Sequence, residues 1–418
     1  MVSGKSIGSL LFICMCIPAF GLDTHQKILR EDVRTLSVRN NNDFMQPPVI
    51  DLNGYNTIDI NFDIIGEKHE DLCYRLIHCN SDWQPSSLVE SEYLSDFNEY
   101  RVEDFEYSYN TFTHYVNYNI RIPASPQSIL KSGNYLLQVY SYDNPDSILL
   151  QARFMVAEDL ATVSGFVSGR TDRGFNDKFQ QLELEVALPN NGEIDPLTDL
   201  KVTVMQNNRP ETERAISTPA FVENGVLHFR HSPYLIFPGG NEYRRFETVR
   251  ADYAGLNVDS VRFVDNQWHA WITPDSQRGD KPYRYDSTQH GRFKIDEYNS
   301  TDPDLSADYV DVHFKLISEE YPETDVYING DFTNNIRDSK TRMHYNNMES
   351  SYEIIMNLKQ GSYNYRYETV SKNGGEDQES NIEGDKYETR NEYLVRVYLR
   401  KPGDRYDRLI GYKVITID

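Results

Sequence analysis

Short stretches in which apolar and polar residues alternate recur along this chain, and they constrain its fold more than any other feature. Residues 116–122 alternate in this way, and residues 309–316 do the same. Successive side chains of a β-strand point to opposite faces, so a period of two predicts half-buried strands. Turn dipeptides separate such runs, as at Asn53-Gly54, Asn224-Gly225 and Asn329-Gly330. Because no long helical pattern intervenes, the sequence predicts an all-β fold of tandem immunoglobulin-like β-sandwich modules.

The length of 418 residues predicts more than one domain. We expect a first β-sandwich domain over residues 22–157, a second over 158–300 and a third over 301–418. The polar stretch 286–304 is interpreted as a linker before the third domain. The first boundary stays open, because residues 155–165 could also form one long bent strand.

The N-terminus has the pattern of a secretory signal peptide over residues 1–21. Lys5 supplies the positive charge, an apolar core follows over residues 7–17, and cleavage after Gly21 would leave Leu22 first. This core is shorter than the roughly 20 residues that span a bilayer. Two cysteines inside it raise the alternative of a lipoprotein, but neither follows the small residue that lipid attachment requires. We therefore expect an exported chain with no direct membrane insertion.

Cys73 and Cys79 are the only cysteines outside the signal peptide. They lie six residues apart on one predicted strand, which corresponds to about 20 Å of extended chain. A disulfide requires Cα atoms within roughly 7 Å of each other. Unless the strand is broken, we expect two buried free thiols.

The charge balance argues against two classes of partner. A formal net charge of −23 disfavours binding to nucleic acid and to anionic membrane surfaces. It is compatible with solubility in a crowded envelope and with docking on a cationic surface of a partner.

Motifs for catalysis, metals and cofactors are missing or incomplete. The run from Gly165 to Gly169 has the wrong spacing for a nucleophile elbow. His228 and His231 lie three residues apart on a predicted strand, so they point to opposite faces and cannot share a metal there. The acidic loop 302–308 could hold calcium, but a solvated loop is the simpler interpretation. The sequence predicts no catalytic residue, metal or cofactor, and a protein that is not an enzyme.

Residues in the third predicted domain resemble a sugar-binding β-sandwich of the glycogen-binding type. The turn over residues 330–335 and the strand over residues 361–367 follow the order of that family. Sugar binding there depends on an aromatic ring at the end of the turn, where this chain has Asn335. The resemblance therefore implies a glycogen-binding-like scaffold without the sugar site.

A second resemblance covers nearly the whole chain. It starts with the strand and polar turn from Tyr74 to Trp83, whose combination of residues no catalytic chemistry requires. The remaining segments that carry it are 104–111, 113–115, 130–140, 153–156, 206–209, 240–246, 307–314, 358–365, 388–393 and 407–411. Together these segments resemble the plug proteins of the bacterial type IX secretion system. Two departures are the turn after Gly330, which lacks its usual tryptophan, and Arg390, which stands where an acidic residue is more usual.

The resemblance implies a non-enzymatic periplasmic protein, associated with the outer membrane, in bacteria of the Bacteroidota. Its partner would be the giant outer-membrane translocon barrel, whose periplasmic side the plug closes when the barrel is idle. The alternatives are a periplasmic carbohydrate-binding protein and an envelope scaffold protein.

Residues 83–98 are our candidate for the surface that contacts the barrel, because they combine aromatic and charged residues outside a strand pattern. The candidate contact residues are Trp83, Glu90, Glu92, Tyr93 and Phe97. The alternative is that Trp83 and Tyr93 only cap the first sandwich.

Overall fold

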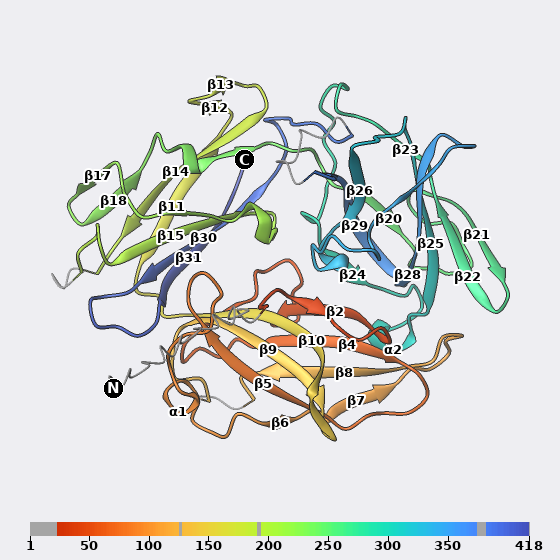
Figure 1. The fold of residues 1–418 in the computed structure, drawn as a ribbon, viewed down its shortest axis with the longest axis horizontal. Coiled ribbons are helices and arrows are strands. Elements are labelled where there is room, and N and C mark those ends of the chain that lie inside the picture. Colours follow the sequence, from red (N-terminus) through yellow and green to blue (C-terminus); the bar gives the residue numbers. More distant parts are fainter. Residues whose placement is uncertain (1–22, 125–127, 190–193, 374–381, 418) are drawn as a thin grey trace, which may run out of the picture.

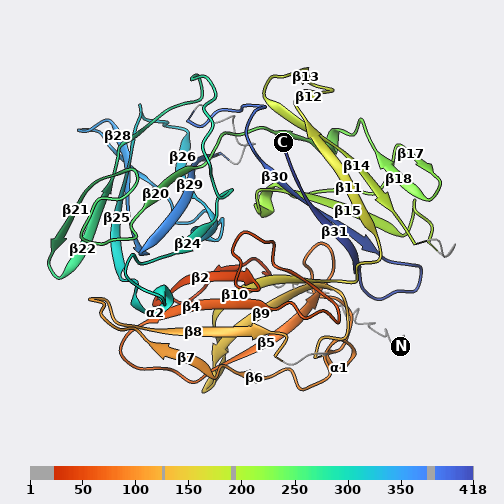
Figure 2. The ribbon, with the colours of Figure 1, turned by 180° about the vertical axis from the view of Figure 1, so that it is seen from behind.

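The structure is a computed structural model that describes residues 23–124, 128–189, 194–373 and 382–417. Within these ranges the chain is mostly β-strand, in several largely antiparallel sheets, with two four-residue α-helices and three short 3-10 helices. The strands form three units around a common centre, and the views from both sides agree on this arrangement (Figures 1 and 2). The predicted signal peptide over residues 1–21 lies outside the described residues.

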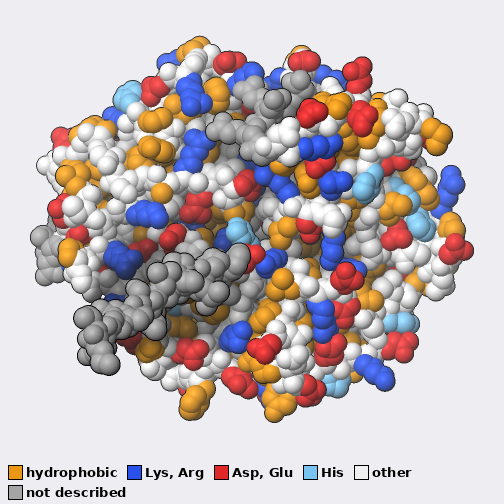
Figure 3. Space-filling view, viewed as in Figure 1, with side chains coloured by type: hydrophobic (Ala, Val, Ile, Leu, Met, Phe, Trp, Pro, Cys, Tyr) orange, Lys and Arg blue, Asp and Glu red, His pale blue; other side chains and the backbone are white. Residues whose placement is uncertain are grey.

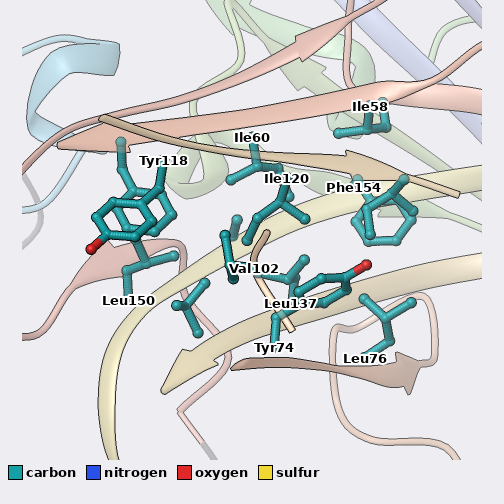
Figure 4. Packing of buried hydrophobic residues seen from close by; sticks show 14 of the residues in the cluster. Ile58, Ile60, Tyr74, Leu76, Val102, Tyr118, Ile120, Leu137, Leu150 and Phe154 are labelled. Atoms are coloured by element: carbon teal, nitrogen blue, oxygen red, sulfur yellow. The ribbon is translucent and has the colours of Figure 1, made fainter. Parts of the chain in front are cut away.

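The first unit consists of two sheets with a shared apolar core. One sheet has the order β1 (Lys27–Ile28), β10 (Asn144–Ala157), β9 (Gly133–Ser141), β5 (Leu72–Cys79) and β6 (Tyr100–Arg101), with β3 (Val49–Asp51) beside β10. The other has the order β2 (Val33–Asn40), β4 (Ile58–Ile65), β8 (Tyr115–Ile122) and β7 (Asp104–Tyr107). Tyr118 and Ile120 of β8 pack toward Leu137 and Phe154 of the facing sheet (Figure 4). The alternation over residues 116–122 thus forms a strand, as predicted.

The second unit combines segments that are far apart in the sequence. One sheet has the order β11 (Thr162–Ser168), β14 (Phe179–Ala187), β18 (Val226–Phe229) and β17 (Phe221–Glu223), with β19 (Ile236–Pro238) beside β14. The other has the order β16 (Arg214–Ile216), β15 (Leu200–Gln206), β30 (Glu392–Leu399) and β31 (Arg408–Thr416). The hairpin of β12 (Arg170–Thr171) and β13 (Gly174–Phe175) and the 3-10 helices η1 (Pro210–Thr212) and η2 (Pro233–Leu235) complete it.

The third unit also has two sheets. One contains β20 (Arg244–Glu247), β29 (Gly361–Ser371) and β24 (Phe293–Ile295), with β26 (Thr324–Asn329) beside β29. The other has the order β21 (Val258–Val264), β22 (Gln267–Ile272), β25 (Tyr309–Ile317), β28 (Ser351–Lys359) and β27 (His344–Asn346), with β23 (Asp275–Ser276) beside β25. Helix α2 (Pro303–Ser306) and the 3-10 helix η3 (Asp331–Thr333) lie in its loops. The alternation over residues 309–316 places Val310, Val312, Phe314 and Leu316 in the core between the sheets.

The strand pairing differs from the domain boundary that we expected at residue 300. Strands β30 and β31, which were expected to close the third domain, pair with β15 in the second unit. Strands β20 to β24, expected in the second domain, lie in the sheets of the third unit. The reason is the burial of β30 on both faces: Val395 and Val397 enter the second core, while Leu394 and Tyr398 pack against the first unit. A strand buried on both faces needs a position inside the molecule.

The stretch 286–304, expected as a linker, is also part of the third unit. Phe293 and Ile295 of β24 enter its core, and the neighbouring Arg292 is buried as well. Polar composition suggested a solvated segment, but the alternation of Phe293 and Ile295 is that of a short strand paired with β29.

The polar face of the first unit is covered by the third unit. Lys359 Nζ lies 2.7 Å from Asp63 Oδ2, and the two side chains are 1% and 0% exposed. Tyr309 donates a hydrogen bond to the same carboxylate oxygen at 2.6 Å, and Asn117 donates to the other oxygen at 2.8 Å. Burial raises the pKa of Asp63 and lowers that of Lys359, while their mutual attraction acts against both shifts. If the two units moved apart, the Asp63 carboxylate and the Lys359 ammonium would each lose their buried partner, which is energetically unfavourable.

The acidic loop 302–308 lies in the same interface. Asp304 contacts Arg39 at 3.2 Å. Asp308 accepts hydrogen bonds from the backbone N–H groups of Phe112 and Thr113 at 2.8 and 3.0 Å. These two carboxylates therefore join the third unit to the first.

We expect Lys359→Met to destabilise the protein by about 3–5 kcal/mol, because it leaves the Asp63 carboxylate buried without its cation. Urea unfolding monitored by circular dichroism measures this loss. The matched control is Lys315→Met, which removes a partly exposed ion pair with Glu349 and should cost at most about 1 kcal/mol. Equal stability of the two variants would contradict the role assigned to the buried pair.

Candidate functional site

The structure separates the five candidate contact residues into buried and exposed positions. Trp83 and Tyr93 are only 8% and 5% exposed, whereas Phe97 is 94% exposed. Glu90 is exposed and Glu92 half-buried on the short helix α1 (Glu90–Tyr93). The first two rings cannot meet a partner while the fold is intact, so the candidate surface reduces to the helix and Phe97.

Trp83 lies at the joint between the first and second units. It has a positive φ of 63°, in a turn closed by a hydrogen bond from its N–H to Asn80 O at 2.9 Å. This turn directs the ring into an apolar cluster with Met155 of the first unit and Leu409 of the second. The Arg153 guanidinium covers the ring, 4.2 Å from its centroid. Trp83 thus packs between the units.

The polar turn before Trp83 holds the loop between β30 and β31. Ser81 N–H donates to Asp407 Oδ2 at 2.8 Å, and Asp407 N–H donates to Asn80 Oδ1 at 3.2 Å. Asn134 connects the two sides: its Nδ2 donates to Asn80 O at 2.9 Å, and its Oδ1 accepts from Tyr398 at 2.8 Å. The Asn-Ser-Asp sequence supplies the side-chain and backbone groups that this joint requires.

His78 is buried beside this turn as a neutral imidazole. Its Nε2 donates to Ser132 O at 3.0 Å, so Nδ1 accepts the hydrogen bond from Ser86 Oγ at 2.9 Å. The rings of Tyr135 and Tyr406 pack edge-on against it. Burial lowers the pKa of His78 to about 4. His78 lies within the motif from Tyr74 to Trp83, but a lone histidine on a predicted strand gives no sign that it packs between two units.

The two cysteines are free and buried, as predicted. Cys79 lies in the cluster around Trp83, and burial raises the pKa of its thiol to about 12. A thiol held protonated in this way is a packing group.

Helix α1 is attached to the fold by its own side chains. Tyr93 donates to Leu76 O at 3.1 Å. Glu92 accepts the N–H of Val89 at 2.8 Å and pairs with Arg405 at 2.8 Å. Glu90 accepts a hydrogen bond from Asn98 at 2.9 Å. Glu90 and Glu92 thus combine a local structural role with an accessible negative charge.

Exposed apolar side chains surround this helix. Besides Phe97, Val89 and Leu130 are 58% and 42% exposed. Leu130 N–H donates to Tyr93 O, which places it beside α1. Asp96 and Glu99 flank Phe97 in the sequence and are exposed. An exposed aromatic ring among carboxylates fits a protein contact with a cationic surface.

The other motifs singled out in the sequence lie apart from this surface. His228 stacks on Phe221, and His231 contacts Asp172. The turn 330–335 faces the second unit, where Asp331 accepts from Asn208 at 3.3 Å. In the described part of the chain, no group of three His, Cys, Asp or Glu side chains is arranged for a metal ion. Nor does any described helix have the length and apolar character to cross a membrane.

These features define the class: a β-rich protein of three interlocked units, whose distinctive sequence motif forms a joint between two of them. Residues 33–158 match the family model for the type 9 secretion system plug protein first domain, which confirms the resemblance seen in the sequence. Residues 33–158, which form the first unit of the fold, thus belong to the first-domain family of the type 9 secretion system plug proteins.

One solved structure is similar over nearly the whole chain. It is the crystal structure of a hypothetical protein from Parabacteroides merdae, with 37% identity and a TM-score of 0.91, covering 94% of this chain and 99% of that one. Latent PorU from Porphyromonas gingivalis is 10% identical with a TM-score of 0.15, covering 93% of this chain and 34% of that one, which is too low to support any argument. No curated protein matches the chain.

We expect Trp83→Ala to lower the free energy of unfolding by about 3–5 kcal/mol, because it removes a large ring from between two units. Chemical denaturation measures the loss. The control is Phe97→Ala, whose ring is 94% exposed and whose removal should change stability by less than about 0.5 kcal/mol. A Trp83→Ala protein as stable as wild type would contradict the role of Trp83 in packing the first unit against the second.

His78 should make stability depend on pH. Its pKa is lowered to about 4 in the folded state, so between pH 6.5 and 4 the unfolded chain takes up a proton that the folded chain does not. Stability is therefore lost as the pH falls through this window, by up to roughly 3 kcal/mol. Urea unfolding at pH 7.5, 6 and 5 should show a shallower loss for His78→Gln than for wild type. An identical pH dependence of the two proteins would refute the assignment.

Proposed function

We propose that this protein is the plug subunit that closes the periplasmic side of the type IX secretion translocon barrel when the barrel is idle. The match of residues 33–158 to the first domain of the plug proteins carries the proposal. The joints between the three units support it. A pore wide enough for folded cargo leaks unless a body of fixed shape sits at its mouth.

The joints give such a body its fixed shape. The Asp63–Lys359 pair and the turn around Ser81 each bury polar groups that are satisfied only by the neighbouring unit. Moving one unit against another would expose or strand these groups, at a cost of several kcal/mol for the ion pair alone. Flexible linkers would permit that motion freely. We therefore infer that the protein docks and leaves as one body.

We propose helix α1 and Phe97 as the contact with the barrel, with Glu90 and Glu92 beside them. Phe97 would be the aromatic anchor and the carboxylates would face cations of the partner. A small apolar anchor within a polar rim suits an interface that has to be released. The partner is the outer-membrane translocon barrel, and the protein acts in the periplasm without catalysing a reaction.

We also propose that each pair of sheets is an immunoglobulin-like module. The modules would comprise residues 23–157, then 158–240 together with 385–417, and residues 241–384 inserted between these two parts. The shared core of β15 and β30 supports this division.

The carbohydrate-binding alternative receives less support. The turn 330–335, which would hold the sugar platform, contacts Asn208 of the second unit and Gln26 of the first. A sugar would have to displace both contacts. An envelope scaffold stays the other alternative, and surface exposure on intact cells would indicate it.

The test is purification of the tagged mature protein from its native host in mild detergent, with identification of the membrane proteins that accompany it. We expect the translocon barrel to co-purify with wild type. Phe97→Asp should reduce recovery of the barrel at least tenfold, because it replaces the proposed anchor with a charge. The protein should keep its melting temperature, since Phe97 is 94% exposed.

Tyr55→Asp is the matched control, because Tyr55 is an aromatic residue of the same unit that is 97% exposed and lies outside the proposed contact. It should retain the barrel. Absence of the barrel from the wild-type purification, with intact translocon in the extract, would overturn the proposed function. Equal recovery with Phe97→Asp and wild type would overturn only the proposed contact.

A further inference from the structure

The ion pair between Lys359 and Asp63 is isolated from solvent. Lys359 Nζ lies 2.7 Å from Asp63 Oδ2, and the two side chains are 1% and 0% exposed. Charged side chains of both signs are interspersed over the face of the molecule in Figure 3, and an ion pair there keeps its contact with water. The Asp63–Lys359 pair has lost that contact, so its amine and carboxyl groups meet in a far less polar environment.

Burial favours the neutral forms of both groups. It raises the pKa of Asp63 and lowers that of Lys359, whereas their mutual attraction acts in the opposite direction. Transfer of one proton from the ammonium to the carboxylate converts the pair into an amine and a carboxylic acid. A lysine amine that burial keeps neutral is a nucleophile, and the carbon of a protonated carboxyl group is open to its attack. The two groups are therefore already in contact as potential reactants.

The two oxygens of Asp63 have different hydrogen-bond donors. Asn117 Nδ2 donates to Oδ1 at 2.8 Å, and Tyr309 Oη donates to Oδ2 at 2.6 Å. In an attack on the Asp63 carboxyl carbon, Oδ1 gains negative charge, which the Asn117 donor stabilises. Oδ2 then leaves, and the hydrogen bond from Tyr309 polarises the bond that breaks. The hydrogen bond between Lys359 Nζ and Oδ2 is the path for the proton that the nitrogen loses.

Thr35 holds Tyr309 at the leaving oxygen. Its Oγ1 lies 2.6 Å from Tyr309 Oη, so Thr35 donates to Tyr309 while Tyr309 donates to Asp63. Thr35 has a positive φ of 53°, which is rare for a β-branched residue, and the register of β2 is irregular between Arg34 and Ser37. Strained backbone that persists in a fold is concentrated at functional sites. This strain supports a reactive centre at the Asp63 carboxyl group.

An amide bond between the two side chains fits the same surroundings. Lys359 Nζ also donates to Asp304 O at 2.6 Å, and the single N–H of an amide can keep this hydrogen bond. The amide oxygen, which is Oδ1 of Asp63 before the reaction, can keep the hydrogen bond from Asn117. The product thus has a partner for its donor and for its acceptor, and it replaces two buried charges with a neutral group.

We propose that Lys359 and Asp63 condense to an isopeptide bond that links the first and third units covalently. The bond from Nζ to the carboxyl carbon forms, the bond from that carbon to Oδ2 breaks, and one water molecule is released, with no oxidant, reductant or co-reactant. The ion pair in the structure is the reactant of this step. The two residues are 296 positions apart, and a cross-link that closes a long loop stabilises a fold by restricting the unfolded chain. The inference does not rest on the proposed plug role, because it concerns the purified protein alone.

The test is the intact mass of the purified mature protein, measured after denaturation. We expect a mass lower than that of the linear mature chain by one molecule of water. Trypsin digestion should then yield the peptide 40–68 joined to the peptide 343–366, uncleaved at Lys359, and tandem mass spectrometry identifies the linkage. Lys315, whose ion pair with Glu349 is partly exposed, is the internal control and should stay unlinked. The linear mass, with no joined peptides, would overturn the proposal.

Two variants test the chemistry. Lys359→Arg keeps a cation beside Asp63 but supplies no lysine amine, so this chain should keep its linear mass. Tyr309→Phe removes the donor at the leaving oxygen and should slow linking by about tenfold or more, measured in samples taken at successive times after a pulse of expression. Circular dichroism confirms that each variant is folded. Loss of water from Lys359→Arg would place the dehydration elsewhere and overturn the proposal, and an unchanged rate in Tyr309→Phe would overturn the role assigned to Tyr309.

Discussion

The arrangement of the three units depends on polar groups that are buried where the units meet. Asp63 is fully buried, and the cation that compensates it, Lys359, comes from another unit almost 300 residues later in the chain. A buried carboxylate left alone costs several kcal/mol, so the two units are stable mainly in the one relative position that closes this pair. An apolar interface of the same area would tolerate sliding, because apolar contacts are non-directional. Directional contacts convert three separate cores into one body.

The first and second units are held together by an apolar cluster and by hydrogen bonds, and these contacts also fix their relative position. Here the ring of Trp83 and the imidazole of His78 are buried beside a turn whose backbone hydrogen bonds are completed by Asp407. The second and third units share a buried ion pair between Arg292 and Glu392. Each pair of units thus has its own joint. Since the three joints close a ring, loosening one joint still leaves the other two to hold the arrangement.

The strands could be predicted from the sequence, but their partners could not. Alternation over 116–122 and 309–316 predicted β8 and β25, because the period of two is a local property of the chain. The pairing of β15 with β30 connects residues nearly 200 positions apart, and no local pattern encodes it. The buried Asn117 of β8 shows a related limit: alternation marks it as the polar side of a half-buried strand, yet it donates to Asp63 beneath the third unit.

The candidate surface over residues 83–98 shows the same limit of a local pattern. Aromatic and charged residues outside a strand pattern are typical of interfaces, which is why residues 83–98 were chosen. Trp83 and Tyr93, however, are buried within the protein, whereas Phe97 and Glu90 are exposed. Sequence composition does not distinguish an internal joint from an external contact, since both require aromatic rings beside satisfied polar groups.

This similarity explains why the polar turn before Trp83 is so informative about the family. A strand needs only alternation, which many residue types supply, so its sequence identifies a fold class and nothing narrower. The turn at Asn80 and Ser81 must present particular donors and acceptors to Asp407 and Asn134, and must bend through a positive φ at Trp83. Few residues meet all these conditions together. A motif that carries no catalytic chemistry can therefore be specific to a family because it specifies how two units of the same chain fit together.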